Sequence, residues 1–128
     1  MIFVDTNYFL RYLIDDNSQQ HLKAIEFFEV NSKKKKLIAT SVLVFFEIFW
    51  NLTSFYQKSD LAAIEIMKKL LNMAFIKFES KTILANALDR ASKGVISFED
   101  CFNLEWATAE GINDLASFDK KLIREWNQ

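Results

Sequence analysis

The first seven residues, Met1-Ile2-Phe3-Val4-Asp5-Thr6-Asn7, constrain the fold of this chain more than any other stretch. Three consecutive apolar residues that favour a strand run directly into an acid and two residues that suit a turn or a helix cap. Because no polar residue precedes Asp5, we expect a central parallel strand with helices on both faces. Ligands bind at the carboxyl ends of strands in open α/β sheets, so Asp5 is a candidate functional residue. The alternative is that Asp5 serves only as a turn or cap residue.

The composition excludes several classes of protein. At 128 residues the chain has the length of one domain, and we expect a single domain over residues 1–128. No apolar run is long enough to cross a bilayer and no signal-type segment is recognisable, so we expect a cytoplasmic protein with no membrane contact. One cysteine excludes a disulfide framework, and two glycines exclude Gly-rich phosphate loops. With 16 basic and 17 acidic residues, any nucleic-acid binding depends on a local arrangement of charge.

Strand-like and helix-like segments alternate along the rest of the chain. Apolar runs bounded by turn residues predict further strands at residues 37–40, 75–79 and 115–117. Helical periodicity predicts helices at residues 8–14, 18–30, 42–52, 61–73, from residue 80 or 82 to Gly94, 98–111 and 120–126. Helical stretches long enough for crossovers separate the strands, so we expect an α/β fold with a parallel sheet between two layers of helices.

Four acids are candidates for one site at the carboxyl edge of this sheet. Asp5 and Asp119 each follow a predicted strand, while Glu47 and Asp100 each lie in the first or second turn of a helix that starts at that edge. Four carboxylates that converge without matching bases repel one another unless divalent cations neutralise them. Oxygen ligands suit Mg²⁺ or Mn²⁺ rather than zinc.

Each of these acids also has a purely structural interpretation. Asp119 can cap the last helix, and Asp100 can form half of a capping pair with Ser97. Glu47 can form a salt bridge, or lie on an exposed polar strip with Asn51 one turn further on.

Together, the quoted residues resemble the PIN-domain nucleases, particularly the VapC-type toxins of toxin–antitoxin pairs. The resemblance is carried by Ile2-Phe3-Val4-Asp5-Thr6-Asn7, by Glu47 in mid-helix, by Phe98-Glu99-Asp100-Cys101 and by Leu115-Ala116-Ser117-Phe118-Asp119. It implies a three-layer α/β/α sandwich with a four-stranded, or possibly five-stranded, mainly parallel sheet. The sequence departs from the family pattern at Cys101-Phe102-Asn103, where smaller apolar residues are expected.

The same resemblance implies a function and a set of site residues. Asp5, Glu47, Asp100 and Asp119 match the acidic quartet, which holds one or two Mg²⁺ or Mn²⁺ ions, and Asp5 and Asp100 match its direct metal ligands. The implied reaction is endoribonucleolytic hydrolysis of RNA, in which the metal activates a water molecule for in-line attack on phosphorus. Asn7 and Ser117 would position the acids or a phosphate.

The resemblance also implies partners, namely RNA, a cognate antitoxin protein and a second copy of the chain in a homodimer. Aromatic residues suit such an interface, although internal packing explains them equally well; they are Phe45, Phe49, Trp50, Phe55 and Tyr56. Arg11 and Lys120 or Lys121 are basic residues that would contribute to RNA specificity.

Rival functions on a similar scaffold are less compatible with the sequence. A haloacid-dehalogenase-like phosphatase needs a second acid at the position of Asn7, and a receiver domain needs an acidic pair before its phosphorylated strand end. A non-catalytic RNA- or protein-binding PIN-like module stays open as the alternative to a nuclease.

Overall fold

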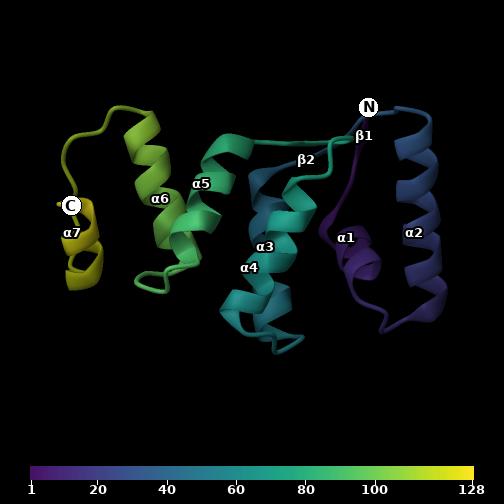
Figure 1. Ribbon diagram of the computed structural model, residues 1–128, viewed down its shortest axis with the longest axis horizontal. Helices are drawn as coiled ribbons and strands as arrows, with labels where there is room; N and C mark the ends of the chain where they lie inside the picture. Colours follow the sequence, from purple (N-terminus) through teal and green to yellow (C-terminus); the bar gives the residue numbers. More distant parts are fainter. The chain divides into compact units, whose positions relative to one another are not determined.

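The computed structural model describes residues 1–128 and divides them into two compact units, Met1–Glu79 and Ser80–Gln128. The helices and strands of both units are labelled in Figure 1. In chain order, the first unit contains β1 (Ile2–Phe3), α1 (Thr6–Leu13), α2 (Ser18–Lys33), β2 (Ile38–Thr40), α3 (Val42–Ser54), α4 (Asp60–Leu71) and β3 (Ile76–Phe78). The second unit contains α5 (Lys81–Ala91), α6 (Phe98–Ala109) and α7 (Lys120–Trp126).

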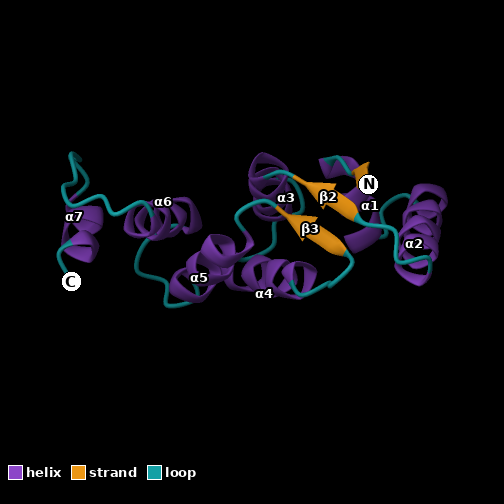
Figure 2. Cartoon of the chain, turned by 90° about the horizontal axis from the view of Figure 1, so that it is seen from above, coloured by secondary structure: helices purple, strands orange, loops and turns teal.

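The three strands form one parallel sheet in the order β1-β2-β3, and Figure 2 shows β2 and β3 side by side. Ile2 pairs with Ile38, and Ile38 with Ile76, so the first residues of the strands are in register. All three strands therefore end at the same edge of the sheet. This arrangement confirms the predicted α/β class and the parallel sheet.

The two faces of this sheet differ in burial. Ile38, Ile76 and Phe78 are buried on one face, whereas on the other Lys77 is exposed and Phe3 keeps 62% of its surface accessible. Right-handed crossovers between strands that follow in sequence order place their helices on the same face. The helices of the first unit therefore cover one face of the sheet, and helices on its other face stay a prediction.

Phenylalanine side chains link the helices of the first unit to the sheet. The ring of Phe9 in α1 lies 5.5 Å from that of Phe28 in α2 and 6.4 Å from that of Phe78 in β3, measured between centroids. Phe45 in α3 meets Phe78 edge to face at 5.7 Å. Six of the 13 phenylalanines are buried in this way or in the second unit, so aromatic packing supplies a large part of the core. Of the aromatic residues considered for an interface, Phe45 and Phe49 are buried, Tyr56 is half-buried, and Trp50 and Phe55 are exposed.

In the second unit α5 packs against α6, and buried residues of these two helices include Leu84, Leu88 and Leu104. Residues 112–117 form no strand, so the structure has three strands and not the predicted four or five. A strand requires a hydrogen-bonded neighbour, and the second unit contains no other extended segment to pair with Leu115-Ala116-Ser117. None of the helices in residues 1–128 combines the length and apolar composition of a membrane span.

Candidate active site

Asp5 follows β1 at the carboxyl edge of the sheet and is the N-cap of α1. Its Oδ1 accepts the backbone N–H of Thr6 at 2.8 Å. Thr6 and Asn7 also suit a cap by residue type, but α1 already begins at Thr6, and Asp5 is the cap, as its structural interpretation predicts, because the carboxylate is a strong acceptor for a free amide at a helix start. The second oxygen, Oδ2, has no protein partner, and Asp5 is exposed. The side chain therefore serves as a cap and keeps one oxygen for a ligand.

Thr6 connects Asp5 to a second acid of the predicted quartet. The hydroxyl of Thr6 donates a hydrogen bond of 2.6 Å to Oε2 of Glu47, while its backbone N–H bonds to Asp5. Thr6 is only 6% exposed, so its hydroxyl is held in place by packing. Hydrogen bonds to a carboxylate are shorter and stronger than those between neutral groups. Thr6, the first residue of α1, thus links Asp5 to Glu47, which is distant in sequence.

Sequence reasoning missed Thr6 as a functional residue. The signal was available, because a hydroxyl directly after a strand-end acid lies in the first turn of a helix at the same edge. The sequence could not show that its partner would be Glu47.

Within its own unit, none of the four predicted acids forms an ion pair. Glu47 is exposed, as the polar-strip interpretation requires, and its salt-bridge interpretation finds no partner in the first unit. The side chain of Asn51 donates a hydrogen bond of 2.8 Å to the backbone carbonyl of Glu47 and none to its carboxylate. Carboxylate oxygens without a cationic partner are suitable ligands for a hard divalent cation.

A further acid, Glu79, lies at the same edge directly after β3 and was not predicted. Its Oε1 accepts the backbone N–H of Val42 at 2.7 Å, at the first residue of α3. The Ser41 hydroxyl accepts the N–H of Val44 at 3.2 Å and is the cap of this helix. Negative charge at a helix N-terminus is favourable. Glu79 thus fixes the start of the helix that carries Glu47.

The other two predicted acids belong to the second unit. Asp119 is the N-cap of α7, and its Oδ1 accepts the backbone N–H groups of Lys121 and Leu122 at 2.9 and 3.1 Å. Ser117 accepts the N–H of Asp119 at 3.0 Å and so helps to fix that acid. Asp100 donates its N–H to the Ser97 hydroxyl at 3.1 Å, which is one half of the expected capping pair. Its half-buried carboxylate has no protein partner.

Neither unit by itself gathers three metal-ligating side chains. The first unit supplies Asp5 and Glu47, joined through Thr6, and the second supplies Asp100 and Asp119. The chemistry of this donor set, exposed or half-buried oxygens with no basic partner, fits Mg²⁺ or Mn²⁺.

Cys101, next to Asp100, is a core residue and not a ligand. It is fully buried in α6, and burial raises the pKa of its thiol to about 11, against a smaller lowering by the nearby Arg90. A protonated, inaccessible thiol is unreactive. The bulkier sequence after Asp100 is therefore accommodated by internal packing.

The chain was compared with known families and proteins. The model of the PIN domain family matches residues 2–125, which include all four predicted acids. Neither the curated proteins nor the solved structures gave a significant match. PIN domains are generally nucleases that use divalent metal ions. Because the match extends over nearly all of its length, the chain belongs to the PIN domain family.

Proposed function

We propose that this protein is an endoribonuclease that hydrolyses RNA phosphodiester bonds with Mg²⁺ or Mn²⁺. The observation that carries the proposal is the pair of exposed carboxylates, Asp5 and Glu47, that Thr6 bridges at the edge of a parallel sheet in a PIN domain. Two carboxylates held together with no basic partner repel each other, and a bound divalent cation would neutralise this repulsion.

In this proposal Asp5, Glu47, Asp100 and Asp119 hold the metal, with Asp5 and Asp100 as direct ligands. Support comes from the absence of any ion pair at these acids and from the free oxygens of Asp5 and Asp100. The protein's own contribution is to orient the carboxylates, through Thr6 for the first pair and Ser117 for Asp119. When bound, the divalent cation lowers the pKa of a water molecule and stabilises negative charge on the phosphate.

We further propose that the protein acts in the cytoplasm as the toxin of a type II toxin–antitoxin pair. Its partners are then a cognate antitoxin and a second copy of the chain. The resemblance to VapC-type toxins supports this role, and so do exposed apolar side chains on α3 and just after it. These are Leu43, Trp50 and Phe55; the spacing of Leu43 and Trp50, seven residues apart, places both on one face of α3.

The test is RNA cleavage by the purified protein with Mg²⁺, with Mn²⁺ and with EDTA. The informative variants are Asp5→Asn and Asp100→Asn, with Asp114→Asn as the control because Asp114 is exposed and forms no interaction. Asparagine caps helices about as well as aspartate, so Asp5→Asn should remove the ligand and preserve α1. We expect cleavage only with the metals and a loss of at least about 100-fold in both site variants, above the usual effect of an outer-shell change.

Cleavage that persists in EDTA, or in both site variants, would contradict the proposed mechanism. RNA binding without cleavage under every condition would favour the non-catalytic binding module. For the toxin role, expression of the wild type should arrest growth, while expression of Asp5→Asn should not. Equal growth with both chains would contradict that role, and a small open reading frame beside the gene would support it.

A further inference from the structure

A polar pocket of about 390 Å³ lies between α1 and α2 of the first unit. Its lining consists of Asn7, Tyr8 and Arg11 from α1 and Gln20, Lys23 and Ala24 from α2. This volume is within the usual range for small-molecule sites, and the two helices pack against each other. The pocket is therefore built from two neighbouring helices of one compact unit.

The pocket carries positive charge in a chain that is nearly neutral overall. Arg11 and Lys23 are basic, and none of the lining residues is acidic. Lys23 is exposed and forms no ion pair. A cation without an acidic partner in a concave surface attracts an anionic ligand.

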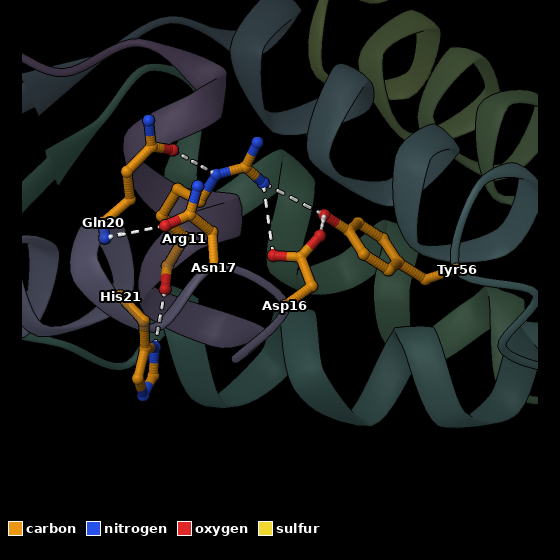
Figure 3. A network of polar contacts seen from close by, with 6 residues as sticks. All are labelled: Arg11, Asp16, Asn17, Gln20, His21 and Tyr56. Carbon is orange, nitrogen blue, oxygen red and sulfur yellow. Dashed lines mark hydrogen bonds and ion pairs between the residues drawn. The ribbon is translucent and has the colours of Figure 1, made fainter.

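Hydrogen bonds fix the guanidinium of Arg11 in the wall of this pocket (Figure 3). Its Nε donates to Oε1 of Gln20 at 2.6 Å, and its Nη1 donates to the Tyr56 hydroxyl at 3.2 Å and to Asp16 at 3.4 Å. Asp16 offsets the charge of Arg11 but leaves its Nη2 without a protein partner and does not reach Lys23. The pocket thus offers one immobilised and one flexible cationic donor.

The other lining groups suit a nucleobase. Tyr8 is 43% exposed, and its ring meets Phe27 edge to face at 5.2 Å, which holds its orientation. An exposed aromatic ring is a stacking platform for an unpaired base. The side-chain amide of Asn7 is exposed and has no hydrogen bond, so it is available to the edge of that base.

The pocket also begins beside the candidate metal ligands. Asn7 directly follows Thr6, which bonds to Asp5 and Glu47. Two residues of chain span at most about 7 Å, so Asn7 and Asp5 are close. One RNA strand can therefore reach both the pocket and those acids.

We infer that this pocket binds one nucleotide of single-stranded RNA next to the phosphate to be cut, an inference that rests on the proposed ribonuclease function. The base stacks on Tyr8 and bonds to Asn7, while Lys23 and Arg11 hold its phosphate. A cation, an amide and an exposed ring together favour a nucleotide over an acidic protein segment, which would need the cations alone.

The test is binding of a short fluorescent single-stranded RNA in EDTA, measured by anisotropy over a series of salt concentrations. The variants are Lys23→Gln and Tyr8→Ala, with Tyr8→Phe as the conservative control. Lys69→Gln is the matched control for charge, because Lys69 is also exposed on a helix of the first unit, outside the pocket, and forms no ion pair. Circular dichroism and thermal melting confirm that each variant folds.

We expect Lys23→Gln to weaken binding by about fivefold at about 0.1 M salt and to reduce the slope of log K against log salt by about 0.7, the value for one phosphate contact. Tyr8→Ala should weaken binding about 5- to 150-fold, while Tyr8→Phe should bind as wild type does because the ring is retained. Lys69→Gln should change neither the affinity nor the slope beyond a weak general effect of charge.

The outcomes separate this inference from the proposed function. Binding that depends on Lys23 and Tyr8 supports the pocket even if the wild type never cuts RNA. Metal-dependent cleavage by a wild type whose binding responds equally to Lys23→Gln and Lys69→Gln would overturn the pocket and leave the nuclease intact. No RNA binding, together with capture of an acidic peptide such as oligoglutamate, would overturn the inference in favour of a protein ligand.

Discussion

Replacing Thr6 with valine is the sharpest test of how the first two acids are held. Valine has nearly the shape of threonine but lacks the hydroxyl that donates to Glu47 at 2.6 Å, whereas the backbone N–H that bonds to Asp5 is kept. Because Glu47 is exposed, water replaces the lost donor, and no buried polar group is left unpaired. We therefore expect a loss of only about 1 kcal/mol in the free energy of unfolding.

The effect on metal binding should be larger than the effect on stability. Without its donor, the Glu47 carboxylate samples several rotamers, and removal of such outer contacts typically costs 10- to 100-fold in metal affinity or activity. The assay is titration of metal-free protein with Mn²⁺, with free Mn²⁺ followed by electron paramagnetic resonance, in parallel with RNA cleavage. Thr6→Ser should behave as wild type because it keeps the hydroxyl.

Thr53→Val is the matched control. Thr53 lies in α3, and its hydroxyl bonds only to backbone carbonyls, those of Phe49 and Trp50, both at 3.2 Å. Equal Mn²⁺ affinity in Thr6→Val and Thr53→Val would refute the view that Thr6 orients Glu47 for a metal.

Three further predictions concern packing and titration. Arg90 pairs with two partly buried glutamates, at 3.1 and 3.6 Å. Because Arg90→Gln leaves both of them without a cation, it should lower the free energy of unfolding by about 2 kcal/mol and speed amide exchange in α7. Arg124→Gln, at an exposed site without ion pairs, should change neither quantity. Tyr56→Phe should cost about 1 kcal/mol in urea unfolding, because it removes the 2.8 Å hydrogen bond to Asp16, and an unchanged midpoint would contradict this. Cys101 should resist iodoacetamide in the native protein and react in urea. Since burial raises the pKa of the Cys101 thiol from 9.0 to about 11, the native state binds the extra proton in that window. Stability should therefore fall as the pH rises from 9 towards 11, less steeply in Cys101→Ala.

Local signals in the sequence were sufficient for the helices and for some of their caps. Ser97 and Asp119 are caps, as their structural interpretations predicted, because a side-chain acceptor before an apolar periodic run is a strong start signal. Residues 120–126 form α7 with the predicted bounds. The helix predicted to begin at residue 18 does begin there, and its cap is Asn17, directly before it.

Features that depend on distant partners could not be predicted. The Thr6–Glu47 bond and the Glu79–Val42 bond join elements far apart in sequence, and no local pattern specifies which donor meets which acceptor. Leu115-Ala116-Ser117 has a strand-like composition but no neighbouring strand in its unit, so propensity alone was misleading.

The pairing of the strands has a consequence for how the protein folds. Ile2 meets Ile38, and Ile38 meets Ile76, so each contact closes a long loop that contains two helices. Closing such loops lowers the chain entropy before any strand pairing can stabilise the product. A short turn joins α5 and α6, so their contact costs less chain entropy. The helical hairpin should therefore form early and the sheet late. The hydrogen bond from Thr6 to Glu47 forms only when β1 and α3 are in place, so a half-folded chain lacks the arrangement on which the proposed RNA cleavage depends.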